Sequence, residues 1–213
     1  MAFCQALHGR GWRVVAAARS AAQLSAELGS AADDVVEIEL TSAGSVREGL
    51  ARIGRVDALI YNAGKFTLAP LLETTAELFE TSWRVNALGA FLCARVLAPQ
   101  MIQRGQGSMI FIGATASVRG GARTHAFASA KHALRGLASS LAKELGPRGV
   151  HVAHLIIDGR VRGERTRQRF PDIDDDQCLE PAAVATTVCS LIEQQRSAWT
   201  FEMDLRPDVE RWS

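Results

Sequence analysis

The side chains best placed to act together in chemistry are Phe127 and Lys131. Apolar residues recur at three- and four-residue spacings over 124–145, which predicts an amphipathic helix that ends at Gly146-Pro147. Lys131 lies one turn after Phe127, so both side chains share one face of this helix. An apolar strand that ends at Gly113-Ala114-Thr115 precedes them. The pattern places an amine beside a phenyl ring, which has no ionisable proton.

Other groups near this pair could supply a proton or a hydrogen bond. Thr115 and Ser117 carry hydroxyls close to Ala114, although Thr115 would point away from Ala114 if the strand continued through it. His125 lies two residues before Phe127 and could act as an acid at neutral pH. The alternative is a histidine at the start of the helix that faces solvent or a loop.

The composition is that of a soluble globular protein with one domain. The 213 residues are 47% hydrophobic and 22% charged, which is enough for one buried core. The formal net charge of +1 gives no electrostatic reason to expect a nucleic acid or an anionic membrane as partner. The four cysteines are far apart, which disfavours a disulfide scaffold or a metal site and favours the cytoplasm. We expect no membrane span and no signal peptide.

Apolar runs typical of strands alternate along the chain with longer periodic runs typical of helices. The predicted strands cover 14–18, 35–40, 57–61, 109–112, 150–157 and 199–205. The predicted helices start near 20, 46, 74, 124 and 181. Ser20 and Thr74 are predicted N-caps, because Gln23 and Glu77 follow at capping-box spacing. The alternation predicts one α/β domain over 1–213, with a doubly wound parallel sheet covered by helices on both faces.

Several of these stretches together resemble the short-chain dehydrogenase/reductase family. Asn62-Ala63-Gly64 follows an apolar strand like that family's Asn-Ala-Gly turn, and Asn86 lies in the next helix like the family's asparagine. Ala114 and Phe127 stand where the family has its catalytic serine and tyrosine, and Lys131 stands where it has its lysine. The order is the family's, and the resemblance covers nearly the whole chain. It implies a Rossmann-like fold and NAD(P)-dependent hydride transfer between small carbonyls and alcohols.

The resemblance also implies roles for the retained residues. Asn62, Ala63 and Gly64 would lie near the cofactor, with Gly64 letting the backbone approach it. Lys131 would contact the nicotinamide ribose. Asn86 would kink its helix and hold a water chain, or would alternatively be a buried asparagine bonded to the backbone.

Two departures from the family pattern affect the chemistry directly. Phe127 cannot supply the proton that the family's tyrosine exchanges with the substrate, and such acid–base catalysis is typically worth ~10²–10⁴-fold. Ala114 removes the hydroxyl that holds the substrate oxygen, a donor worth about 10²-fold or more by analogy with oxyanion donors. The resemblance therefore implies impaired or altered chemistry.

A third departure concerns the start of the chain. The family begins with a strand and a glycine-rich Gly-x-x-x-Gly-x-Gly turn, which places the pyrophosphate on a helix N-terminus. Residues 1–7 resemble the second half of the helix that follows that turn. About 15–20 residues are therefore expected to be missing, either because the start is placed too late or because the protein is truncated.

The residues at the end of the predicted strand 14–18, which matches the family's second strand, indicate which dinucleotide would bind. Ala18-Arg19-Ser20 contains no acid for the ribose hydroxyls of NAD, and Arg19 suits the 2′-phosphate of NADP. Glu39 stands where the family has an aspartate near the adenine. NADP is the predicted cofactor, with NAD as the alternative.

Asp158-Gly159 follows the strand 150–157 and is predicted to form an ordinary turn. The segment 160–169 after it is rich in arginine. It could bind an anionic ligand or a cofactor phosphate, or it could be a solvated flexible loop.

These observations leave three hypotheses for function. The first is a divergent, NADP-linked oxidoreductase with an altered proton source. The second is a non-catalytic relative, a pseudoenzyme that binds a dinucleotide or a protein partner, and the third is a truncated product without function. The resemblance implies a homodimer or homotetramer built from the helices at 74 and 127, whose outer faces carry Leu88, Leu92, Leu137 and Leu141.

Overall fold

Strands β4 and β5 form the centre of the molecule. We describe residues 1–209 of a computed structural model. The strands are β1 (Val15–Ala18), β2 (Asp34–Glu37), β3 (Ala58–Tyr61), β4 (Gly107–Ile112), β5 (Val150–Ile157), β6 (Arg160–Val161), β7 (Cys178–Leu179) and β8 (Glu202–Leu205). Every residue of β4 and β5 is buried, including the polar Ser108, His151 and His154, as expected for central strands of a parallel sheet covered on both faces.

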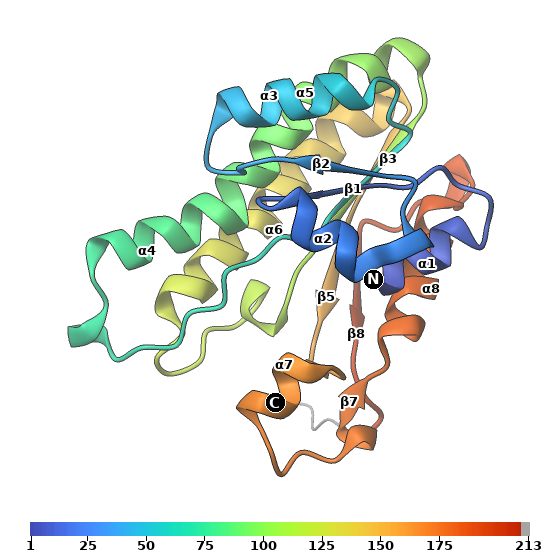
Figure 1. Cartoon of the computed structure of the whole chain (residues 1–213). Helices are drawn as coiled ribbons and strands as arrows, with labels where there is room; N and C mark the ends of the chain where they lie inside the picture. Colours follow the sequence, from blue (N-terminus) through green and yellow to red (C-terminus); the bar gives the residue numbers. More distant parts are fainter. Residues whose placement is uncertain (210–213) are drawn as a thin grey trace.

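Helices cover both faces of the parallel sheet β3-β4-β5-β8. The helices are α1 (Ala2–His8), α2 (Ala21–Leu28), α3 (Ala43–Ile53), α4 (Ala76–Trp83), α5 (Gly89–Arg104), α6 (His125–Leu145), α7 (Glu164–Arg169) and α8 (Pro181–Ile192). Figure 1 shows α4, α5 and α6 on one side and α1 and α8 on the other. Met109 and Phe111 of β4 pack with α5 and α6, whereas Ile110 and Ile112 pack with α8. The predicted α/β architecture is confirmed.

The sheet is divided between β1 and β3. β1 pairs only with β2 in a separate two-stranded parallel sheet among the described residues. A cavity of about 690 Å³ lies between the two sheets and is lined by residues of β1, such as Val15, and of β3, such as Leu59. Residues of β3 are only partly buried apart from Tyr61, unlike those of β4. One backbone edge of β1 and one of β3 therefore lack a neighbouring strand in the described part of the chain.

One of the two predicted helix caps is wrong. Ser20 caps α2 as expected, because its hydroxyl accepts the N–H of Gln23. The predicted cap Thr74 instead donates its hydroxyl to the carbonyl of Pro70, and Thr75 caps α4 by accepting the N–H of Leu78. A capping-box spacing does not distinguish two adjacent threonines, since the backbone conformation decides which one caps.

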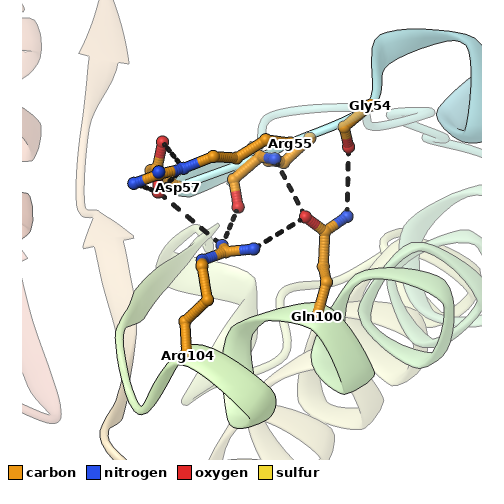
Figure 2. A network of polar contacts seen from close by, with 6 residues as sticks. Gly54, Arg55, Asp57, Gln100 and Arg104 are labelled. Atoms are coloured by element: carbon orange, nitrogen blue, oxygen red, sulfur yellow. Dashed lines mark hydrogen bonds and ion pairs between the residues drawn. The ribbon is translucent and has the colours of Figure 1, made fainter.

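A polar clamp joins the C-terminal half of α5 to the segment before β3 (Figure 2). Gln100 accepts the N–H of Val56 and donates to the carbonyl of Gly54. Arg104 donates to the carbonyl of Val56 at 2.7 Å and to the side chain of Gln100. Asp57, which also pairs with Arg55, lies 3.6 Å from Arg104. The clamp fixes where β3 begins relative to α5.

The helical run 76–104 is long and apolar enough to cross a membrane by length and composition alone. The expectation of no membrane span did not take this run into account. Ala90, Cys93, Leu97 and Met101 of this run are buried in the core that also contains Met109. Because buried core helices pass the same test, the run is weak evidence for a membrane.

Candidate active site

A pocket of about 500 Å³ opens beyond the carboxyl ends of β3, β4 and β5. In open α/β sheets this is the edge where ligands bind. Most of the residues singled out in the sequence line it: Asn62, Gly64, Ala114, Phe127 and Lys131. Ala63 lines the larger cavity between the sheets instead, together with Asn62. The fold thus brings distant predicted positions to one site.

Lys131 forms a cationic part of the pocket wall. It lies on the buried face of α6 with only 5% of its surface exposed, and its Nζ donates to the carbonyl of Ile112 at 2.8 Å. Burial lowers the pKa of Lys131 to about 8, since the charged form loses hydration. The amine is therefore close to half protonated at slightly alkaline pH.

Phe127 extends the wall next to Lys131 with an apolar ring. The Lys131 Nζ lies 5.8 Å from the centre of the Phe127 ring. Phe66, which is 48% exposed, packs edge-on against Phe127 with the ring centres 4.9 Å apart. No hydroxyl can come from position 127, so the pocket is aromatic where the sequence resemblance places an acid.

The turn after β4 decides which hydroxyls reach the pocket. Thr115–Ser117 forms a 3-10 turn, so Thr115 does not continue the strand past Ala114. Ser117 is fully buried and its Oγ accepts the N–H of Ala114 at 3.1 Å. Its hydroxyl is therefore used within the turn and does not replace the missing serine. Thr115 lines the pocket and is partly exposed.

Asn86 lies behind the pocket in a π-helical segment, Arg84–Leu88, that joins α4 to α5. Its Nδ2 donates to the carbonyls of Ser82 and Lys65. Its buried Oδ1 has no hydrogen-bond partner among the described residues, and a Cβ at Gly64 would lie 3.2 Å from it. The buried asparagine bonded to backbone is therefore observed, in a π-helical part of the helix, whereas the water chain stays a prediction.

Asp158 lies behind the pocket wall, where it holds the lining residues Thr115 and Arg119, and sequence reasoning missed this role. It is 3% exposed and accepts the Thr115 hydroxyl at 2.6 Å. It also pairs with Arg119 and Arg206, both of which lie within about 3 Å of it. The expectation of an ordinary Asp-Gly turn is therefore incomplete. The available signal was a lone carboxylate directly after eight buried residues of β5, which requires buried partners.

His154 lies on the same side of β5 as Lys131. Its Nδ1 is 3.1 Å from Glu202, and Glu202 is held by Arg135 through contacts of 2.6 and 2.8 Å. Burial lowers the pKa of His154, and the hydrogen bonds from Arg135 lower the pKa of Glu202. His125 does not join this group: it contacts the Thr74 hydroxyl at 2.7 Å and is not among the pocket residues.

Arg19 and Glu39 lie apart from the pocket, after β1 and β2. Arg19 is exposed. The Glu39 carboxylate accepts the backbone N–H and the hydroxyl of Thr41, and these bonds lower its pKa, with a smaller contribution from Arg19. The Glu39 carboxylate is therefore already hydrogen-bonded within a local turn.

The arginine-rich segment is folded and is not an open loop. It contains β6, α7 and the pairing of β6 with β7. Arg162 and Arg167 pair with Asp175, and Arg162 also pairs with Glu180. Arg169 stacks on Phe66 at 4.3 Å, which joins α7 to the pocket wall. The expectation of a loop is therefore wrong over Glu164–Arg169, although most side chains of this helix are exposed to solvent.

A family profile described as short chain dehydrogenase matches residues 1–172. The chain belongs to the short-chain dehydrogenase family. It is 33% identical over 150 residues to the L-xylulose reductase of Bos taurus, a match that covers 70% of this chain and 62% of that relative. The chain thus matches less than two thirds of the length of such curated relatives.

Solved structures of short-chain dehydrogenases share the fold. One from Rhodopseudomonas palustris is 36% identical, with a TM-score of 0.79 over 97% of this chain and 92% of that one. A metagenomic short-chain oxidoreductase in complex with NADP is 26% identical, with a TM-score of 0.81 over 98% and 91% of the two chains.

The site residues fit a dinucleotide in part. On the nicotinamide side, Lys131 and Gly64 line the pocket, and the buried Asn86 Oδ1, which has no partner among the described residues, lies next to Gly64. On the adenosine side, Arg19 is exposed after β1. Within residues 1–209, no glycine-rich turn follows a strand at the place where a pyrophosphate would bind.

Proposed function

We propose that this short-chain dehydrogenase is an NADP-linked oxidoreductase of small carbonyls or alcohols, with a weakened proton-transfer step. The observation that carries the proposal is Lys131, a buried amine that opens onto a pocket at the carboxyl ends of the strands. A nicotinamide bound there would supply or accept the hydride. Lys131 would contact its ribose, and the pocket formed by Phe66 and Phe127 would exclude water from the reacting carbon.

NADP is the proposed cofactor because of charge at the end of β1. Arg19 is exposed there, and its neighbours Ala18 and Ser20 are uncharged. A guanidinium matches a phosphate through several N–H donors, whereas the ribose hydroxyls of NAD favour an acid. A relative that is 26% identical was solved in complex with NADP.

An additional strand between β1 and β3 is part of the proposal. The cavity of about 690 Å³ is lined by apolar side chains and by one open edge of each of the two sheets. A parallel strand placed there would pair both edges and could end in a phosphate-binding turn next to α1. We propose that a segment upstream of Met1 supplies it.

The test is a titration with NADPH, followed by tryptophan fluorescence, of the 213-residue chain and of a version extended upstream. The proposal expects saturable binding that is at least tenfold tighter in the extended version, with folding of both verified by circular dichroism. If neither folded form binds NADPH, the proposal is wrong. A tighter dissociation constant for NADH than for NADPH would overturn the cofactor preference alone.

The proton-transfer step is tested by restoring the missing hydroxyls. Phe127→Tyr combined with Ala114→Ser should raise turnover of carbonyl substrates by about 10²–10⁴-fold, because a proton donor returns. The control pairs Phe127→Leu with Ala114→Ser, which changes the ring without adding an acid. No gain in the tyrosine variant, despite NADPH binding, would mean that the site is not arranged for hydride transfer.

The second candidate function is a non-catalytic dinucleotide or protein-binding module. The loss of both hydroxyls at positions 114 and 127 favours it. It predicts NADPH binding without hydride transfer in single-turnover experiments, in the wild type and in the restored variant alike. Single-turnover transfer by the wild type, even if slow, would exclude it.

We further propose that the protein is cytoplasmic and assembles as a homodimer or homotetramer. All four cysteines are free thiols, which suits a reducing compartment. Phe79, Trp83 and Phe91 on α4 and α5 are each about 40% exposed, while Leu92, Leu137 and Leu141 pack against the core. Sedimentation equilibrium tests the assembly, and a monomer at micromolar concentration would contradict it.

A further inference from the structure

Lys131 differs in its surroundings from the other lysines of the chain. The sequence contains three lysines, Lys65, Lys131 and Lys143, and its remaining basic side chains of this kind are arginines. Lys65 and Lys143 are exposed, so water solvates their charged amines. Lys131 is 5% exposed and belongs to the pocket wall. A reaction that favours a desolvated amine would therefore single out Lys131.

The Lys131 amine lies where the ends of β3 and β4 meet the pocket. Its Nζ donates to the carbonyl of Ile112, the last residue of β4, at 2.8 Å. A Cβ on Gly64, an exposed residue that follows β3, would lie 3.7 Å from Nζ. The centre of the Phe127 ring is 5.8 Å away. Because Ile112, Gly64 and Phe127 all line the pocket, the amine lies at the pocket wall and not inside the closed core.

The Lys131 amine has no acidic partner among residues 1–209. Its one hydrogen bond goes to a backbone carbonyl, and burial lowers its pKa to about 8. His154 on β5, which is held by Glu202 and Arg135, interacts electrostatically with it. Burial lowers the pKa of His154, so this ring adds no negative charge. Roughly a tenth of the Lys131 amine is therefore neutral at pH 7, against less than about one part in 10³ for a lysine in water.

A neutral, desolvated lysine is a nucleophile toward carbonyl groups. We propose that Lys131 binds small aldehydes and ketones covalently, as an imine. The Nζ lone pair attacks the carbonyl carbon, a C–N bond forms, and the π electrons of the carbonyl move to its oxygen. A proton passes from nitrogen to that oxygen and gives a carbinolamine. The nitrogen lone pair then expels hydroxide, which leaves as water with the remaining proton of the nitrogen, so no oxidant or reductant is consumed.

This activity goes beyond the proposed function, because it needs neither a dinucleotide nor hydride transfer. It belongs to the protein without a cofactor, since a nicotinamide ribose in contact with Lys131 would cover the amine. Phe66 and Phe127 form the apolar part of the same wall and pack edge to face. An uncharged aromatic aldehyde therefore suits the pocket.

The test traps the imine with sodium cyanoborohydride, which reduces it to a stable secondary amine. The 213-residue chain is incubated with benzaldehyde at pH 7, and the labelled sites are located by peptide mass spectrometry. Lys131 should gain a benzyl group at least about tenfold faster than Lys65 or Lys143, because a larger fraction of its amine is neutral. Mapping also separates Lys131 from the α-amino group of Met1, which is a further primary amine.

Two controls show whether the reactivity depends on the fold. In denaturing guanidinium chloride, Lys131 should lose its advantage and react at the rate of Lys65 and Lys143, because its amine is then hydrated. Lys131→Met should remove the fast label and leave the labelling of Lys65 and Lys143 unchanged, with folding verified by circular dichroism. If that variant does not fold, the mapping of the wild type decides.

The outcomes distinguish this inference from the proposed function. Fast labelling of Lys131 that NADPH suppresses supports both the inference and the proposed ribose contact. Fast labelling that NADPH leaves unchanged supports the inference and contradicts that contact. Labelling of Lys131 in the folded protein at the rate of Lys65 and Lys143, or more slowly, overturns the inference. An advantage that persists in guanidinium chloride overturns it as well.

Discussion

Lys131 illustrates how one buried charge carries a cost that depends on pH. Its amine is desolvated on α6 and keeps one hydrogen bond, to the carbonyl of Ile112. Phe127 beside it adds apolar surface and no counter-charge. The charged form of Lys131 is therefore disfavoured in the protein without a ligand. A ligand with a hydrogen-bond acceptor would stabilise that charged form.

The first prediction follows from this desolvation. Burial lowers the pKa of Lys131 from 10.5 to about 8. The unfolded chain then binds more protons than the folded chain between these values, so the contribution of Lys131 to the free energy of unfolding rises with pH through that window. Relative to Lys131→Met, the wild type should gain about 3 kcal/mol between pH 7 and pH 10.5.

Urea unfolding of the two proteins across this pH range measures the gain. Taking the difference removes Tyr61 and Cys93, whose pKa values are raised by burial and which oppose the trend in both proteins. A difference that stays constant with pH would show that Lys131 is not desolvated.

The second prediction concerns Gly113, at the end of β4. A Cβ there would overlap His154 Nε2 and lie 2.8 Å from Ser117 Oγ, and both side chains are fully buried. Gly113→Ala should therefore lower the free energy of unfolding by about 1–3 kcal/mol. Gly136→Ala is the matched control, since a Cβ on that helical residue meets no atom within 4 Å and should stabilise by about 0.5–1 kcal/mol. Equal thermal midpoints for the two variants would contradict the argument.

At the scale of the elements, the junction of α4 and α5 positions Asn86 next to the site. The π-helical segment Arg84–Leu88 turns Asn86 toward Gly64, and the Tyr61 hydroxyl donates to the carbonyl of Val85. Such segments occur frequently at functional sites. The opposite end of α5 is held by the clamp around Gln100, so the helix is fixed at both ends.

The third prediction tests that clamp. Gln100→Ala removes the acceptor for Val56 N–H and the donor to the Gly54 carbonyl, and should lower the free energy of unfolding by about 1–2 kcal/mol. Gln103→Ala on the same helix changes an exposed glutamine and should alter it by at most about 0.5 kcal/mol. Urea midpoints measure both. If the two variants unfold alike, the clamp contributes nothing to stability.

At the scale of the whole molecule, the divided sheet makes stability uneven. β4 and β5 are wholly buried and have neighbours on both sides, whereas β1 pairs only with β2 in the described structure. Two-stranded sheets are marginal without further packing. Here that packing comes from α3, whose Val46 and Leu50 join the core beside Val36 of β2.

The fourth prediction is that β1 and β2 open before the rest of the sheet. Native-state hydrogen exchange should give their amides a lower opening free energy than those of β4 and β5, which should exchange only by global unfolding. Extension upstream of Met1 should raise protection in β1 and β3 if a strand fills the cavity between them. Uniform protection of all these strands in the 213-residue chain would contradict the predicted difference in their opening free energies.

The sequence was sufficient for the order of the main elements and for much of the pocket, but it did not predict β6, α7 or β7. Strand β5 was predicted with its observed bounds, since a largely apolar run between Gly149 and Asp158-Gly159 has few alternatives. The spacing of Phe127 and Lys131 predicted their shared face, because helical periodicity is local. Ala114 and Gly64 were assigned to the same site through the family resemblance, and both line the pocket at the carboxyl ends of the strands.

Only the tertiary structure decided the contacts between residues far apart in the chain. Asp158 meets Thr115 and Arg206 through strand order, which no local spacing contains. Whether Thr74 or Thr75 caps α4 depended on the path of the loop before it, and the Glu39 carboxylate accepts hydrogen bonds from the neighbouring Thr41. Local periodicity determines which face of an element is buried, whereas the polarity of the pocket arises from hydrogen bonds that form once the elements are packed together.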